Sequence, residues 1–189
     1  MITLPSASTA LILIDLQNGI TAFQTEPHSS HSVVTRCQEL AHRFRNAGAP
    51  VVVVNVGFSS DFADALNAPI DQPLEAPPGG FVEGWDDIVD GLAAPSDIRI
   101  TKRHWGAFYG TELDLQLRRR GVSTVVIAGI ATNLGVESTA RSAHEHGYAV
   151  VLVEDATASF STEMHAFAFE HIFPRLGRST TSVEIELQS

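Results

Sequence analysis

Cysteine and positive charge are both scarce in this chain. Cys37 is the only cysteine among 189 residues, so no intramolecular disulfide can form, which fits a reducing compartment. Lys and Arg number 12 against 22 Asp and Glu, giving a net charge of −10. Nucleic acids and anionic membranes bind basic surfaces, so we expect neither as a partner. The apolar runs are strand-sized and no basic leader precedes them, so we expect no signal peptide, no transmembrane helix and a cytoplasmic location.

Motifs for nucleotides and metals are also missing. The chain has no GxGxxG and no GxxxxGK[ST] pattern, so neither a dinucleotide site nor a P-loop is predicted. Two histidine pairs have short spacings, His28 with His31 and His144 with His146, and we expect both to face solvent. The sequence therefore predicts no cofactor and no metal.

What the sequence does have is a regular alternation of short apolar runs with helical patterns. The length fits one domain covering residues 1–189. We expect buried strands at 10–14, 51–56, 98–102, 125–128 and 149–153. Helical periodicity covers 31–46 and 111–120, and it returns after residue 133. This alternation predicts a three-layer α/β/α fold, a mostly parallel Rossmann-like sheet with helices on both faces.

Four other segments carry expectations of their own. Residues 57–84 form a long loop without regular structure, predicted to cover an active site or to lie at an interface. Residues 86–92 suggest a short helix, and 181–187 alternate like a half-buried edge strand. Ser161 is expected to cap a helix whose apolar side includes Met164 and Phe167.

The stretch from Val122 to His146 is the expected centre of the protein. It is predicted to contain a buried strand, a tight turn from Gly129 to Asn133, and the start of a helix. The first N–H groups of a helix lack intrahelical acceptors and favour negative charge. The turn is therefore predicted to bind a carboxylate, a phosphate or a developing oxyanion.

Two other predicted strands end on opposite charges. Asp15 follows the run 10–14, and Lys102 ends the run 98–102. Such a pair can be an ion pair that terminates two strands, or a desolvated pair poised for proton transfer. The helix N-terminus expected beside it favours the second interpretation, because it adds an electrostatic stabiliser.

Three segments resemble the motifs of the isochorismatase-like hydrolase family, in the family's order and spacing. They read ALILIDLQNGI, ITKRHWGAFYGTELD and VVIAGIATNLGVESTARSA, and the resemblance runs from about Thr9 to Phe173. It implies a six-stranded parallel sheet, a homodimer or homotetramer, and a small-molecule substrate. It also implies a cis peptide bond between Ile130 and Ala131.

Carried over by position, the family's catalytic aspartate falls on Asp15 and its lysine on Lys102. The nucleophilic cysteine of the amidase members falls on Gly135, which has no side chain. No thioester can form there, and Cys37 is expected to pack in the core instead. We therefore expect a cysteine-independent hydrolase and not a nicotinamidase.

Glycine at this position resembles the true isochorismatases, which cleave a vinyl ether without a nucleophilic cysteine. There Asp15 would protonate the enol-ether carbon and water would add to the cation. Burial and an anionic substrate would raise the pKa of Asp15 and Lys102 would lower it, and the sequence leaves the balance open.

Isochorismate itself is a dicarboxylate, yet no arginine lies between Arg45 and Arg99. Lys102, Arg103 and backbone N–H groups remain as anion ligands, and a neutral or monoanionic substrate is the better match. Two alternatives stay open. One is a non-catalytic binding protein on the same scaffold, and the other is a structural subunit whose pocket is closed by side chains.

Four further side chains are expected near the site. Phe23 and Trp105 are predicted to form pocket walls. Asn133 is predicted to line the pocket or to cap the helix that begins there. Gln17, next to Asn18, is expected to brace its loop by hydrogen bonds.

Overall fold

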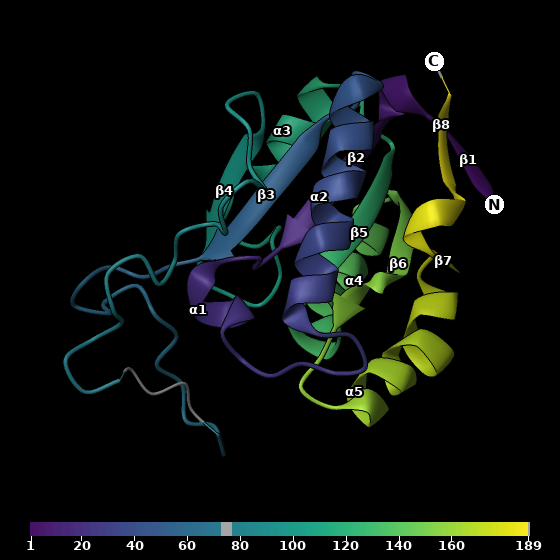
Figure 1. Ribbon diagram of the computed structural model, residues 1–189. Coiled ribbons are helices and arrows are strands. Elements are labelled where there is room, and N and C mark those ends of the chain that lie inside the picture. The colour runs from purple at the N-terminus through teal and green to yellow at the C-terminus, as the bar shows by residue number, and fades with distance from the viewer. Residues whose placement is uncertain (73–76, 189) are drawn as a thin grey trace.

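The computed structural model describes residues 1–72 and 77–188. Its main sheet has six strands in the order β4-β3-β2-β5-β6-β7, and every neighbouring pair is parallel (Figure 1). The strands are β2 (Thr9–Ile14), β3 (Val51–Val56), β4 (Ile98–Lys102), β5 (Thr124–Ile130), β6 (Ala149–Ala158) and β7 (Arg178–Thr180). This confirms the predicted fold class.

Helices cover both faces of the sheet, which completes the three layers. The helices are α1 (Asn18–Thr21), α2 (Ser30–Asn46), α3 (Leu113–Arg119), α4 (Glu137–Glu145) and α5 (Thr162–Phe167). The long helix α2 packs on one face, while α3 and α4 pack on the other (Figure 1). Two separate apolar cores result, one on each side of the sheet.

The central strands explain why their sequences are continuously apolar. Every residue of β2 and of β5 is buried. Along β2, Leu11 and Leu13 enter the core beneath α2, whereas Ile12 and Ile14 enter the core beneath α3 and α4. Successive side chains point to opposite faces of a strand, so a strand covered on both sides needs apolar residues at every position.

The edge strand predicted at 181–187 is present only from Ile185 onward, and it does not belong to the main sheet. The sixth strand of the sheet is β7, and a 3₁₀ turn at Ser182–Glu184 interrupts the alternating segment. Beyond that turn, β8 (Ile185–Gln188) pairs in parallel with β1 (Ile2–Pro5) in a separate two-stranded sheet (Figure 1). The alternation arises because Ile185 and Leu187 pack against the α2 side of the core.

Two helix expectations also need correction. Residues 86–92 form turns, and Ile88 makes an antiparallel bridge to Gln17. Ser161 does cap α5, but Met164 and Phe167 are 49% and 57% exposed. The inward position is taken by His165, which is 4% exposed. A π-helical turn at Ala168–Ile172 continues the helix, so a regular period of 3.6 assigns the wrong inward side.

The long loop at 57–84 contains no helix or strand among its described residues, and residues 73–76 lie outside them. Four aromatic rings fold it back on itself: Phe58, Phe62, Phe81 and Trp85 contact one another in sequence. The Phe81 and Trp85 rings stack with their centroids 3.9 Å apart. Among the helices that the structure describes, none combines the length and apolarity needed to cross a membrane.

The strand order creates a switch point between β2 and β5. After β2 the chain adds β3 and β4 on one side, and it then crosses back to add β5, β6 and β7 on the other. Open α/β sheets bind ligands beyond the carboxyl ends of the strands at such a point. Asp15 and the turn after β5 both lie there.

Candidate functional site

Asp15 follows the last residue of β2 in an uncommon conformation. Its φ is +52°, a left-handed value that aspartate tolerates better than most residues do. Its backbone N–H donates to the Val54 carbonyl at 2.9 Å, so the neighbouring strand holds it in place. The residue is 6% exposed, and its Oδ1 atom is buried with no hydrogen-bond partner among the described residues. A buried carboxylate oxygen without a donor costs free energy and marks a site where a ligand or water can bind.

Lys102 ends β4 and neutralises this carboxylate from within the protein. Its Nζ atom donates to Asp15 Oδ2 at 2.7 Å and to the His104 carbonyl at 3.1 Å. The lysine side chain is 2% exposed, so this ion pair differs from the weak pairs of protein surfaces. The predicted pairing of the two strand ends is present.

Burial outweighs the lysine in setting the protonation of Asp15. Desolvation raises the pKa of Asp15 to about 6, although the charge and hydrogen bond of Lys102 act to lower it. At neutral pH roughly one carboxyl group in ten is then protonated. A carboxylic acid with a pKa near the working pH is suited to give or take a proton.

The end of β5 approaches β2 more closely than a side chain would allow. A Cβ atom on Gly129, whose φ is +121°, would lie 2.2 Å from the Ile14 carbonyl oxygen. The strand runs on to Ile130, the peptide bond between Ile130 and Ala131 is cis, and a π-helical turn follows at Thr132–Val136. The cis bond occurs where the family resemblance implies it.

Some of the turn's N–H groups are already used. Those of Leu134 and Val136 both donate to the Ala131 carbonyl, at 3.1 and 3.2 Å. The sequence predicted free N–H groups at this turn, and these two are not free. The unusual π-helical winding separates this turn from an ordinary helix N-terminus, whose first donors lack partners.

Gly135 lies directly beside the acid. A Cβ atom built on it would be 3.2 Å from Asp15 Oδ2, 2.9 Å from Ile14 Cγ2 and 3.4 Å from the Trp105 carbonyl oxygen. The position is buried, and two of these distances are tighter than ordinary van der Waals contact. The surroundings have closed around a residue without a side chain.

Thr139 joins two walls of the site, a role that the sequence analysis missed. Its hydroxyl donates to the Gly135 carbonyl at 2.7 Å and accepts from the Ala107 N–H at 3.1 Å. It thereby fixes the segment after Lys102 against the π-helical turn. A threonine one helical turn after Gly135 could have signalled this, because such hydroxyls bond to the carbonyl four residues earlier.

The remaining predicted site residues are two exposed aromatic side chains and one hydrogen-bonded amide. The Phe23 and Trp105 side chains are 54% and 63% exposed, and Phe23 stacks edge-on against Phe160. Asn133 accepts from Ser159 Oγ and donates to Met164 Sδ. The prediction that Asn133 caps the helix is wrong, because no side chain caps either helical segment there.

Two polar residues after Asp15 brace the neighbouring loop as expected. Gln17 is fully buried, and its amide donates to the Val56 carbonyl at 3.0 Å and accepts from the Val56 N–H at 2.8 Å. Asn18 donates to the Gly84 carbonyl at 3.1 Å. Arg103, an expected anion ligand, instead pairs with Asp64 of the long loop.

Cys37 lies in the core, as predicted. It is fully buried on α2, with its Sγ atom 3.6 Å from the Ala156 carbonyl oxygen. Burial strongly raises the pKa of its thiol, so the reactive thiolate form is suppressed. It offers no replacement for a nucleophile at Gly135.

Both histidine pairs were expected to face solvent, and His31, His144 and His146 do, whereas His28 is partly buried. His28 lies instead with Glu154 and His165, whose ligand atoms come within 4.8 Å of one another. The sequence analysis expected no metal site and could not see this group, because Glu154 is 126 positions from His28. His165 also contacts Thr132 of the π-helical turn.

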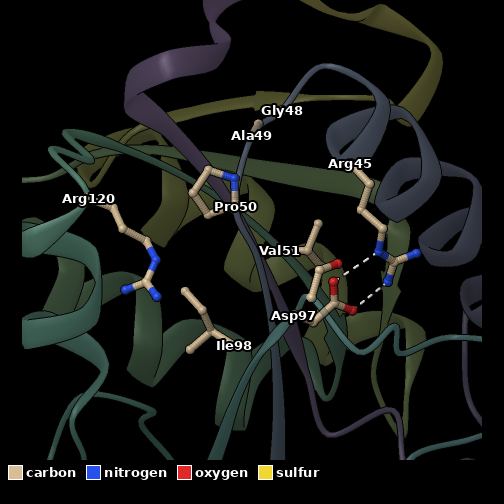
Figure 2. A pocket seen from close by; sticks show the side chains of 9 residues that line it. Arg45, Gly48, Ala49, Pro50, Val51, Asp97, Ile98 and Arg120 are labelled. Carbon is tan, nitrogen blue, oxygen red and sulfur yellow. Dashed lines mark hydrogen bonds and ion pairs between the residues drawn. The ribbon is translucent and has the colours of Figure 1, made fainter.

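A pocket on the opposite edge of the sheet does not compete with this site. Figure 2 shows it beside Val51 and Ile98, the first residues of β3 and β4. The guanidinium of Arg45 at its wall is held by Asp97 in two hydrogen bonds, at 2.6 and 3.0 Å. The pocket holds no acid–base pair like that of Asp15 and Lys102.

Comparison with known proteins places this geometry in a family. The family sequence model of the isochorismatase domain matches residues 9–184 of this chain. The chain belongs to the isochorismatase family. An uncharacterised isochorismatase family protein of Escherichia coli O157:H7 is 49% identical over 186 residues, which cover 98% of each chain. A ureidoacrylate amidohydrolase of Stutzerimonas stutzeri is 30% identical, covering 82% of this chain and 72% of that protein.

A solved structure agrees closely with the fold. An isochorismatase family protein from Burkholderia thailandensis has a TM-score of 0.91 and 44% identity, covering 95% of this chain and 94% of its own. Membership of the isochorismatase family supports hydrolysis in general terms.

Proposed function

We propose that this isochorismatase family member is a cysteine-independent hydrolase that cleaves a C–O bond of a small vinyl ether or related compound. The observation that carries the proposal is the position of Gly135. A missing side chain lies beside a buried carboxyl group whose pKa is raised to about 6. The site therefore offers a proton donor, Asp15, but no cysteine nucleophile at position 135.

In the proposed reaction Asp15 acts as a general acid. Its protonated carboxyl gives the proton to the terminal carbon of the vinyl ether, which leaves an oxocarbenium ion and a carboxylate. Water adds to the cation, and the resulting hemiketal separates into a carbonyl compound and an alcohol. The proton released from the water returns to Asp15, so the enzyme is unchanged. Lys102 stabilises the carboxylate formed in the first step, because its Nζ atom is 2.7 Å from Oδ2.

Backbone groups near Gly135 complete the proposed site. Ile130, Ala131 and Asn133 are the proposed wall that faces the reacting atoms, and backbone N–H groups of this turn are the proposed ligands of developing negative charge. Phe23 and Trp105 are the proposed rim, since both residues are more than half exposed and the Trp105 carbonyl oxygen lies near Gly135.

The charges around the site favour a neutral or monoanionic substrate. When Asp15 is protonated, as the proposed reaction requires, Lys102 leaves one uncompensated positive charge near the substrate. Arg103 is neutralised by Asp64, so it adds no second positive charge for a dicarboxylate. A dicarboxylate would therefore need a cation from outside this pair, such as one from a neighbouring subunit.

Asp15 is only 6% exposed, so its carboxyl group is largely out of contact with bulk solvent. Residues 104–107 are held beside it, because the His104 carbonyl accepts from Lys102 and the Ala107 N–H donates to Thr139. Exclusion of bulk water in this way protects reactive intermediates.

A substrate panel tests the proposal. The purified protein is offered vinyl ethers, esters and amides of similar size, and the Asp15→Asn variant is run alongside. We expect turnover of at least one vinyl ether, no turnover of the amides, and at least a thousandfold lower kcat/KM for the variant. Full activity in Asp15→Asn would disprove the acid assignment. Ligand binding without turnover across the panel, detected as a rise in Tm, would point to a binding protein on this scaffold.

A further inference from the structure

Three side chains from distant parts of the sequence converge outside the Asp15 site. His28 lies in the loop before α2, Glu154 in β6 and His165 in α5. Glu154 Oε1 is 3.0 Å from His28 Nε2 and 3.0 Å from His165 Nε2. One carboxylate oxygen and two imidazole nitrogens therefore lie within 4.8 Å of one another.

The backbone around these three residues brings their segments together. Strand β6 leaves its register with β5 between Leu152 and Thr157, and Glu154 lies in that irregular segment. The loop that carries His28 is tied to the end of β6 by two hydrogen bonds between Glu26 and Ser159, at 2.7 and 2.8 Å. The hydroxyl of Thr25 donates to the His28 carbonyl at 2.8 Å and closes the loop.

The ring of His165 is oriented from behind. Its Nδ1 atom is 2.9 Å from the hydroxyl of Thr132, a fully buried residue, which directs Nε2 toward Glu154. Histidines that bind metals have the second ring nitrogen fixed by a hydrogen bond in this way. The same contact connects the group to the π-helical turn beside Asp15.

We propose that His28, Glu154 and His165 bind a divalent transition-metal ion of the Zn²⁺ class. Two imidazoles with one carboxylate suit Zn²⁺, Co²⁺ and similar ions better than Mg²⁺ or Ca²⁺, which prefer oxygen ligands alone. Ligand atoms of a tetrahedral zinc site lie about 3.3 Å apart. The two separations of 3.0 Å require an expansion of only a few tenths of an ångström.

Solvent can reach this group, which an ion and a fourth ligand require. The His28 and Glu154 side chains are 24% and 37% exposed, whereas that of His165 is 5% exposed. A water molecule would complete the tetrahedron from the open side. The bound ion would join the loop before α2, the sheet and α5, and through Thr132 it would stiffen the turn that carries Gly135.

Direct metal binding tests this assignment without any knowledge of the substrate. Untagged protein is stripped with a chelator, and Zn²⁺ is then titrated in competition with a chromophoric chelator. We expect one high-affinity ion per chain, and Co²⁺ in its place should give the visible absorption of a tetrahedral site. His28→Asn and Glu154→Gln should each weaken the affinity by at least about 100-fold.

His31→Asn is the matched control, because His31 is exposed, lies three residues from His28 and does not belong to the group. Its affinity should equal that of the wild type. Absence of stoichiometric Zn²⁺ binding, or equal affinities in His28→Asn and His31→Asn, would overturn the proposal. The three side chains would then form a hydrogen-bonded cluster without an ion. His28 lies in a partly exposed loop, so its variant should fold, and its metal-free Tm checks this.

Discussion

Two carboxylates, Asp15 and Glu154, project from parallel strands that flank β5, yet their surroundings differ in almost every respect. Asp15 is 6% exposed and pairs with one buried ammonium, and its second oxygen has no partner among the described residues. The Glu154 side chain is 37% exposed and accepts from two imidazoles. The strand supplies the position of each carboxylate, and the packing around it determines its chemistry.

The pKa values follow from this difference. Burial raises the pKa of Asp15 to about 6, and the single lysine only partly opposes it. Burial also acts to raise the pKa of Glu154, but hydrogen bonds from His28 and His165 outweigh it, and the pKa falls below its ordinary value. Asp15 is thus prepared to exchange a proton, whereas Glu154 stays a carboxylate ready to accept hydrogen bonds or to bind a cation.

Of the changes that test this difference between Asp15 and Glu154, replacing Lys102 by Met should have the largest effect on activity. The ammonium lowers the pKa of Asp15 and stabilises the carboxylate left after proton transfer, so kcat/KM should fall about 100-fold or more. If Asp15 acts as an acid, the wild-type kcat/KM falls as pH rises through about 6. Removing Lys102 should move that limb to higher pH.

Arg103→Met is the matched control, because Arg103 is adjacent in sequence but pairs with Asp64 of the long loop. It should change kcat/KM by less than about threefold, as expected for a partly exposed ion pair. A pH limb that stays in place in Lys102→Met would mean that another group carries the proton.

The same contrast explains what could be predicted from the sequence. Asp15 and Gly135 were identifiable because each lies in a motif that follows a continuously apolar strand, and Lys102 because it lies in a motif at the end of β4. The His28 group was not, since its members are ordinary residues that come together only through the irregular register of β6. The pKa of Asp15 could not be predicted from the sequence either, because it depends on how completely neighbouring segments exclude water. The strand predicted at 181–187 was right only from Ile185 onward for a related reason. Its alternation reflects the packing of Ile185 and Leu187 on the core and does not indicate which strand they pair with.

Filling Gly135 should have the next largest effect. A Cβ atom there would come within 2.9 Å of the fully buried Ile14 side chain, so Gly135→Ala and Gly135→Cys should each lower the free energy of unfolding by about 1–3 kcal/mol. The crowding against Asp15 should also prevent Gly135→Cys from acquiring amidase activity. Urea denaturation and an amide-hydrolysis assay measure the two effects.

Gly106→Ala provides the comparison for this change, because a Cβ there would meet its nearest neighbour at an ordinary 3.5 Å. It should cost less than about 1 kcal/mol. Amide hydrolysis by Gly135→Cys would show that the missing thiol is the only barrier to amidase chemistry, and that the space beside Asp15 adapts to it.

Glu154→Gln should have the smallest effect and the one most informative about the comparison. In metal-free protein it weakens two hydrogen bonds to imidazoles, so the free energy of unfolding at pH 7 should fall by about 0.5–1.5 kcal/mol.

Asp15→Asn should change the way in which the free energy of unfolding depends on pH. The raised pKa of Asp15 contributes stability that is fully present below pH about 4 and is lost as pH rises through about 6. The wild type should therefore lose stability relative to Asp15→Asn between pH 4 and pH 8, by roughly 2–3 kcal/mol if the pair titrates alone. Urea unfolding at both pH values measures this difference, and a constant difference would mean that Asp15 ionises in the folded protein as readily as in the unfolded chain.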